Sequence, residues 1–198
     1  MYPENIKNLI DCLKNLPGIG DKSAERLAFS MINFDKEKLS FFSDTLINIR
    51  DNIRRCSICN NISDKEICSI CSNDDRKKDI IFVVEKPKDI VLFEKINVFK
   101  GVYHVLDGLI SPLDGINPDD INLKSLIERI KNDNVKEIIL ALKPSIEGET
   151  TMQYIKRILA NNNVKITKIA TGIPMGTDIE YIDSMTLEMS LEERKELS

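Results

Sequence analysis

Two closely spaced cysteine pairs constrain the fold of this chain more than any other feature. They are Cys56-Ser-Ile-Cys59 and Cys68-Ser-Ile-Cys71. Two residues between thiolates allow both sulfurs to reach one tetrahedral ion, and four thiolates fill its coordination shell. We therefore predict one structural Zn²⁺ bound by all four. A redox role is the alternative, although one Cys-x-x-Cys pair suffices for that chemistry. The remaining Cys12 falls on an apolar helical face, so we expect it to be buried.

The bulk composition is typical of a folded cytoplasmic protein. The 198 residues are 42% hydrophobic, without a secretory signal or an apolar run of the roughly 20 residues that a membrane span needs. A net charge of −4 argues against a protein that simply coats polyanions, because phosphate contacts need clustered Lys and Arg. Six basic residues flank the cysteine pairs and are equally consistent with solvated charge or a phosphate-binding patch: Arg50, Arg54, Arg55, Arg76, Lys77 and Lys78.

The N-terminal third has helical periodicity throughout. Apolar residues recur at helical spacing over 6–13 and again over 24–31, and the break between them contains Pro17, Gly18 and Gly20. This pattern predicts a helical hairpin. A third apolar stripe over 39–53 predicts a long amphipathic helix that leads into the cysteine region.

The second half alternates between strand and helix patterns. Short β-branched runs over 80–84, 102–106, 138–142 and 164–170 predict strands, and the segments 123–130 and 152–159 have helical apolar faces. Such alternation predicts an α/β domain with a mainly parallel sheet covered on both faces. We expect four parts in this multidomain α/β chain: a helical region (1–54), a zinc module (55–78), an α/β domain (79–170) and a glycine-containing C-terminal segment (171–198). An acidic helix near 190–197 is expected to pack on the domain or on a neighbouring subunit.

The break in the N-terminal hairpin, Leu16-Pro17-Gly18-Ile19-Gly20, resembles the helix-hairpin-helix motif of DNA-binding proteins. Its glycines would expose backbone N–H groups at a helix start, where the helix dipole also favours a phosphate. Lys22 and Arg26 lie four residues apart, so both can face one nucleic-acid backbone. The alternative is a plain helical hairpin whose glycines merely permit close packing.

Three carboxylates follow predicted strands. Glu85 ends the first strand, and Glu147 and Glu149 follow the third; the carboxyl ends of parallel strands form the ligand crevice. The pattern resembles the Toprim domain of topoisomerases and primases, which would hold Mg²⁺ there. Lys143 and Ser145, however, stand where such an enzyme presents paired aspartates, and a cation there would repel the metal. Weak Mg²⁺ binding, contact with a basic partner and a solvated acidic rim remain open for the three glutamates.

His104 and the segment 111–115 are interpreted as structural. His104 lies within an apolar strand and has no assignable nucleophile beside it. The segment Ser111-Pro112-Leu113-Asp114-Gly115 predicts a turn rather than a phosphate loop.

Taken in order, these features resemble the RecR family of bacterial recombination mediators over essentially the full length. Besides the hairpin and the cysteines, the resemblance rests on Val84-Glu85-Lys86-Pro87, Gly101-Val102-Tyr103-His104-Val105-Leu106, the segment 111–115, Glu147-Gly148-Glu149, Gly172-Ile173-Pro174-Met175-Gly176 and Glu180-Tyr181. Lys143 stands where the family commonly shows asparagine.

The resemblance implies a non-enzymatic factor in recombinational DNA repair. Members form ring-like homo-oligomers, dimers or tetramers, that encircle DNA, and they help RecO and RecF to load recombinase onto gapped or single-stranded DNA. Carried over, Lys22 and Arg26 would face single-stranded, double-stranded or gapped DNA, and Glu85, Glu147 and Glu149 would mark the Toprim face that contacts partners. A Mg²⁺-dependent Toprim nuclease or primase-like enzyme, and a zinc protein that only bridges other proteins, are the alternative hypotheses.

Overall fold

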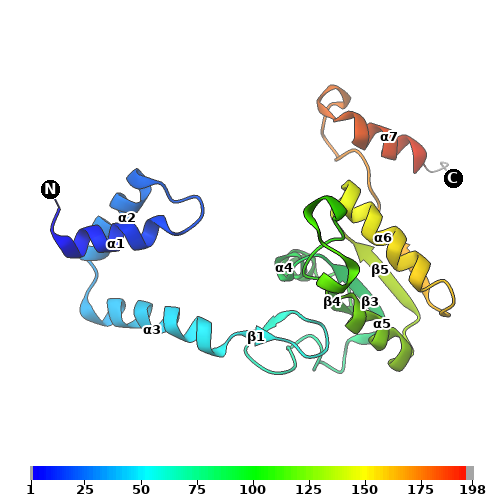
Figure 1. The fold of residues 1–198 in the computed structure, drawn as a ribbon, viewed down its shortest axis with the longest axis horizontal. Coiled ribbons are helices and arrows are strands. Elements are labelled where there is room, and N and C mark those ends of the chain that lie inside the picture. Colours follow the sequence, from blue (N-terminus) through cyan, green and yellow to red (C-terminus); the bar gives the residue numbers. More distant parts are fainter. Residues whose placement is uncertain (1, 195–198) are drawn as a thin grey trace. The chain divides into compact units, whose positions relative to one another are not determined.

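The computed structural model describes residues 2–194, which form two compact units (Figure 1). Contacts within the chain separate Met1–Ile53 from Arg54–Ser198. The first unit is helical, and the second contains the two cysteine pairs and both sheets. No helix in the described part of the chain is both long and apolar enough to span a membrane.

The helical unit consists of α1 (Glu4–Lys14), α2 (Asp21–Ile32) and α3 (Lys36–Asn52), which confirms the predicted helices. Helices α1 and α2 pack around Ile10, Ala24 and Ala28, since small alanine side chains let the two backbones approach. The expectation for Cys12 is wrong: it is exposed, because α2 covers only the side of α1 that carries Ile10. Residues 2–194 bury no residue of α3.

The second unit begins with a two-stranded antiparallel sheet of β1 (Arg54–Arg55) and β2 (Ile62–Ser63). A four-stranded parallel sheet follows in the order β4-β3-β5-β6. Its strands are β3 (Lys77–Val84), β4 (Gly101–Val105), β5 (Glu137–Ala141) and β6 (Lys165–Lys168), which confirms the four predicted strands with shifted ends.

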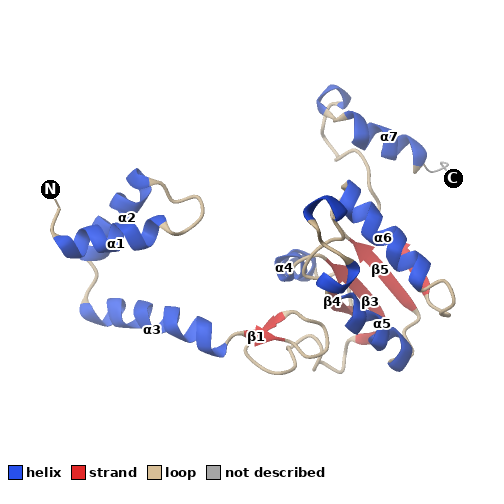
Figure 2. Cartoon of the chain, in the orientation of Figure 1, coloured by secondary structure: helices blue, strands red, loops and turns tan. Residues whose placement is uncertain are grey.

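Helices cover both faces of the parallel sheet, as expected for strands joined by helical crossovers (Figure 2). Side chains alternate along β3: Ile81 and Val83 pack with α5 (Leu123–Asn132) and α6 (Ile146–Ile158), while Phe82 and Val84 pack with α4 (Pro87–Ile96). Helix α4 is absent from the sequence-based prediction. Its start signals are local, since Pro87 occupies the first turn and Asp89 accepts from the Lys86 N–H at 2.9 Å.

The remaining segments are short. The predicted turn at 111–115 contains a 3₁₀ turn, Pro112–Asp114; two more such turns are Pro118–Asp120 and Ile179–Tyr181. The final helix, α7 (Ser184–Glu192), begins earlier than the predicted 190–197 because the Asp183 side chain caps it, accepting from the Thr186 N–H at 2.9 Å. Residues 195–197 of that prediction lie outside the described residues.

Candidate zinc centre and nucleic-acid interface

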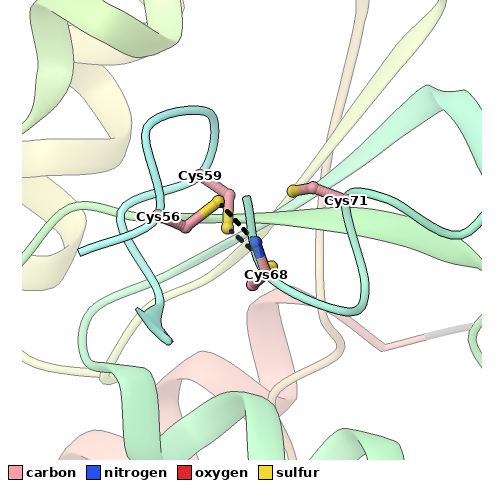
Figure 3. A group of neighbouring side chains, drawn as sticks. All are labelled: Cys56, Cys59, Cys68 and Cys71. Carbon is pink, nitrogen blue, oxygen red and sulfur yellow. Dashed lines mark hydrogen bonds between the residues drawn. The ribbon is translucent and has the colours of Figure 1, made fainter. Parts of the chain in front are cut away.

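The four cysteines of the two pairs converge on one point (Figure 3). Their Sγ atoms all lie within 4.8 Å of one another, and the Sγ atoms of Cys59 and Cys68 are 3.6 Å apart. Four sulfurs about 2.3 Å from a tetrahedral Zn²⁺ would be separated by about 3.8 Å, so the cluster has the right size. All four side chains are buried, and four thiolates would fill a tetrahedral shell without an open coordination position. The geometry therefore fits a structural zinc ion.

Local hydrogen bonds hold the ligands in place. The Cys68 N–H donates to Cys56 Sγ at 3.3 Å, a bond that favours a thiolate acceptor. The first pair folds back through Asn60, whose φ of 60° is a left-handed conformation that asparagine tolerates. Without a metal, the hydrogen bond between the Cys59 thiol and the Cys68 sulfur, with Cys59 as donor, raises the pKa of Cys59, so a bound cation is needed to keep all four sulfurs ionised.

The zinc module is joined directly to the edge strand of the parallel sheet. The Val105 N–H donates to the Cys59 carbonyl at 2.9 Å, and Asn60 Nδ2 donates to the Val105 carbonyl at 3.3 Å. Arg55 Nη2 also donates to both oxygens of the Asp107 carboxylate, at 2.8 and 3.0 Å. The module thus occupies backbone groups that an edge strand would otherwise leave unpaired.

The hairpin turn leaves the start of α2 open. Gly18 has a φ of +81°, which explains a glycine there, and a Cβ atom on Gly18 or Gly20 would meet no atom within 4 Å. Close packing is therefore not what requires these glycines. Lys22 and Arg26 are exposed, and they lie on the side of α2 away from the buried Ala24. In the described part of the chain neither forms an ion pair.

The three glutamates occupy separate environments. Glu85 pairs with Lys86 at 3.1 Å, and Glu149 lies 3.6 Å from the Lys168 ammonium. The Ser145 side chain, and more weakly Lys143, lower the pKa of Glu147. Among the described residues, the cysteines are the only set of three or more acidic, His or Cys side chains whose ligand atoms come that close together. The structure therefore does not bring these three carboxylates together as one ligand set.

The basic residues around the cysteines divide into two groups. Arg55, Arg76 and Lys78 form ion pairs with Asp107, Glu94 and Asp74. In residues 2–194, the other three form none: Arg50, Arg54 and Lys77. Three of the six basic residues considered for a phosphate-binding patch are therefore paired with a carboxylate of the chain itself.

Family comparisons match the chain segment by segment. Family models match for "RecR, helix-hairpin-helix" over residues 6–50, the four-cysteine zinc finger domain of RecR over 53–73, "Toprim domain" over 79–170 and "RecR, C-terminal" over 172–195. "Recombination protein RecR" of Natranaerobius thermophilus is 45% identical over 196 residues, covering 99% of this chain and 98% of the relative. The proteins of the same name from Lactobacillus helveticus and Lactobacillus acidophilus are both 47% identical over 197 residues, covering 99% of each chain. The chain belongs to the RecR family.

Membership of the RecR family confirms the zinc assignment and the Toprim-like α/β fold. Sequence reasoning missed a polar network that links the zinc module to the Toprim sheet. Arg76, just after the cysteines, contacts Glu94 on α4, and the Tyr103 hydroxyl donates to the same carboxylate at 2.7 Å. The hydrogen bond from Arg76 lowers the pKa of Glu94. Nothing in the sequence spacing pairs these residues.

The environment of His104, in β4, agrees with the structural role predicted for it. Its side chain is fully buried, and its Nε2 lies 2.8 Å from the Asn122 carbonyl. Burial lowers the pKa of His104 to about 4, so the ring is neutral at physiological pH.

Proposed function

We propose that this chain is a non-enzymatic, DNA-binding recombination mediator that helps to load recombinase onto gapped or single-stranded DNA. The observation that carries the proposal is the open start of α2, where exposed Lys22 and Arg26 stand beside the glycine turn. Backbone N–H groups and two cations at a helix start suit phosphates, and such contacts position a protein on DNA without selecting sequence. The names of the full-length relatives, "Recombination protein RecR", support the recombination role.

The salt dependence of DNA binding tests the proposed surface. Replacing Lys22 and Arg26 by alanine should weaken binding to gapped duplex and reduce the slope of log K against log salt by about 1.8, since each lost phosphate contact changes it by about 0.9. Lys7→Ala with Lys36→Ala is the matched control, because it removes the same charge from exposed positions of the same unit. An unchanged slope in the first variant, with its helical content intact, would refute this surface.

The non-enzymatic part of the proposal rests on the Toprim crevice. Glu85 is paired with Lys86, and Lys143 stands where a metal would need a carboxylate. A Mg²⁺-dependent nuclease or primase-like activity is the alternative. Incubating the zinc-loaded chain with gapped DNA, nucleotides and Mg²⁺ distinguishes them: strand scission or synthesis that Glu85→Ala abolishes would establish the enzyme.

We also propose that the chain acts as a ring-shaped homo-oligomer, a dimer or a tetramer. Helix α3 supports this, since Phe41, Leu46 and Ile49 are 73%, 56% and 56% exposed on a helix that buries nothing against residues 2–194. Light scattering should show a smaller mass for Leu46→Glu. Asn48→Glu, which adds the same charge at a polar position of α3, should leave the mass unchanged; a parent chain that is monomeric would contradict the ring.

RecO and RecF are the proposed protein partners, and Glu85, Glu147 and Glu149 are the residues proposed to contact them or to bind Mg²⁺ weakly. Carboxylates that do not form one metal-ligand set can serve a basic partner surface. Glu147→Gln with Glu149→Gln should then weaken RecO or RecF binding in a pull-down or calorimetric titration. Glu128→Gln, at an exposed position of α5, should not.

In this proposal the chain works through four parts in the cytoplasm. Residues 1–54 contact DNA, 55–78 form the zinc module, 79–170 form the Toprim-like partner domain, and 171–198 contribute to contacts between subunits. Residues 195–198 of the last part lie outside the described structure.

A further inference from the structure

The parallel sheet has a topological switch point between β3 and β5. The chain leaves β3 through α4 to reach β4 on one side, and it leaves β5 through α6 to reach β6 on the other. Because α4 and α6 cover opposite faces, the segments that follow β3 and β5 diverge at the carboxyl edge. In open α/β sheets, ligands bind in the crevice that such divergence creates.

A cavity of about 460 Å³ lies at this point. Its walls come from the segments after both strands and from α4: Glu85, Lys86, Lys88, Asp89, Leu92, Phe93, Ala141, Leu142 and Lys143. The lining therefore contains three lysines and two acids. Its charge is opposite to that expected of a site built to hold a divalent cation.

The two acids already have partners within the cavity wall. Glu85 pairs with the Lys86 ammonium at 3.1 Å, and Asp89 accepts from the Lys86 backbone N–H at 2.9 Å. Lys88 and Lys143 are exposed and form no ion pair with any described residue. With three lysines and two acids the lining has a net charge of +1, and its two ammonium groups without an ion pair come one from each of the diverging segments.

We propose that this crevice binds the terminal phosphomonoester of a DNA strand, with Lys88 and Lys143 as its cationic ligands. A phosphomonoester carries a charge of nearly −2 at pH 7, whereas an internal phosphodiester carries −1, so two lysines favour the strand end. The adjacent start of α4 adds a helix dipole of the right sign. The proposal rests on the proposed DNA-binding function and adds to it a means of recognising the end of a strand at a gap.

The test compares two gapped duplexes that differ only in a 5′-phosphate or a 5′-hydroxyl at the gap edge. The zinc-loaded full chain should bind the phosphorylated duplex about 3- to 10-fold more tightly. Lys88→Gln with Lys143→Gln should abolish this preference while retaining binding to the unphosphorylated duplex. Lys156→Gln is the control and should keep the preference, because it lies in the last turn of α6, at the opposite edge of the sheet.

Equal affinity of the parent chain for both duplexes would overturn the inference while leaving the proposed function intact. A preference that persists in the double variant would equally overturn it. If the chain binds neither duplex, the proposed function fails, and amide NMR shifts decide the crevice separately. The inference is supported if the amide signals of residues 85–89 and 141–143 shift with a 5′-phosphorylated dinucleotide and not with its unphosphorylated form. If they shift with orthophosphate or a mononucleotide but not with the phosphorylated dinucleotide, the crevice is a site for free phosphate instead.

Discussion

Replacing Arg76 should destabilise the sheet-containing unit strongly. Arg76 Nη1 donates to Glu94 Oε1 at 2.9 Å and to the carbonyls of Phe99 at 3.4 Å and Gly101 at 3.3 Å, and Nη2 pairs with the other carboxylate oxygen of Glu94. The side chains of Arg76 and Glu94 are only 16% and 29% exposed. Arg76 therefore joins the segment after the zinc module to α4 and to the start of β4.

The magnitude follows from what Arg76→Ala leaves behind. Glu94 keeps only the Tyr103 hydroxyl as a hydrogen-bond donor, and two carbonyls lose a donor. Removing one member of a buried ion pair costs about 3–5 kcal/mol, and water reaching the partly exposed Glu94 reduces this to about 2–3 kcal/mol. A unit of this size loses about 2–4 °C in melting temperature per kcal/mol, so we expect a fall of about 4–12 °C.

The difference in stability between the parent and Arg76→Ala should depend on pH with a definite sign. The pKa of Glu94 is lowered in the folded state, first by its hydrogen bond from Arg76. Such a carboxyl contributes stability above its ordinary pKa of 4.5, and that stability is lost as the pH falls through the folded pKa. The gap in stability between parent and Arg76→Ala should thus be full at neutral pH and shrink below about pH 4.5.

Thermal unfolding followed by circular dichroism measures both effects. Lys78→Ala is the matched control, because its nearby ion pair with Asp74 is 53% and 94% exposed, and solvent screening leaves such a pair little effect on stability. A double-mutant cycle with Glu94→Gln isolates the pair. The reasoning is refuted if Arg76→Ala lowers the melting temperature no more than Lys78→Ala does. It is also refuted if the difference in melting temperature between the parent and Arg76→Ala grows as the pH falls below 4.5.

Three further predictions concern the zinc centre, a glycine contact and the buried histidine. Cys68→Ser should lower bound zinc below one ion per chain and lower the melting temperature, measured by metal analysis and calorimetry; full zinc content with unchanged stability would contradict the assignment. Gly148→Ala should cost about 1–3 kcal/mol, because its Cβ would lie 1.9 Å from the Lys143 carbonyl oxygen, whereas Gly172→Ala meets no atom within 4 Å and should stay within about 0.5 kcal/mol in the same denaturation assay. NMR of His104, the single histidine, should show a neutral ring until the pH approaches about 4. The free energy of unfolding should fall as the pH drops below 6.5, because the unfolded chain then binds a proton that the folded chain does not. A titration of His104 near pH 6.5 would contradict its burial.

The sequence by itself determined the features that depend on spacing and periodicity. Two Cys-x-x-Cys pairs specify a tetrahedral metal site because the ligand spacing is local. The continuous apolar runs predict the four strands, because successive side chains of a strand point to opposite faces and a sheet covered on both faces needs apolar residues on each. The glycine turn before α2 is equally local, since only the backbone conformation at Gly18 has to be satisfied.

Only the tertiary structure decided which distant side chains meet. Arg76 contacts Glu94 where β3 and β4 begin, and Lys88 shares a cavity with Lys143 where β3 and β5 end, because the order β4-β3-β5-β6 makes these strands neighbours. Glu85, Glu147 and Glu149 follow neighbouring strands, yet in the described part of the chain they form no common ligand set. Periodicity determines which face a residue occupies within its own element, but the charge of a site depends on strand order and on the partners that each side chain finds.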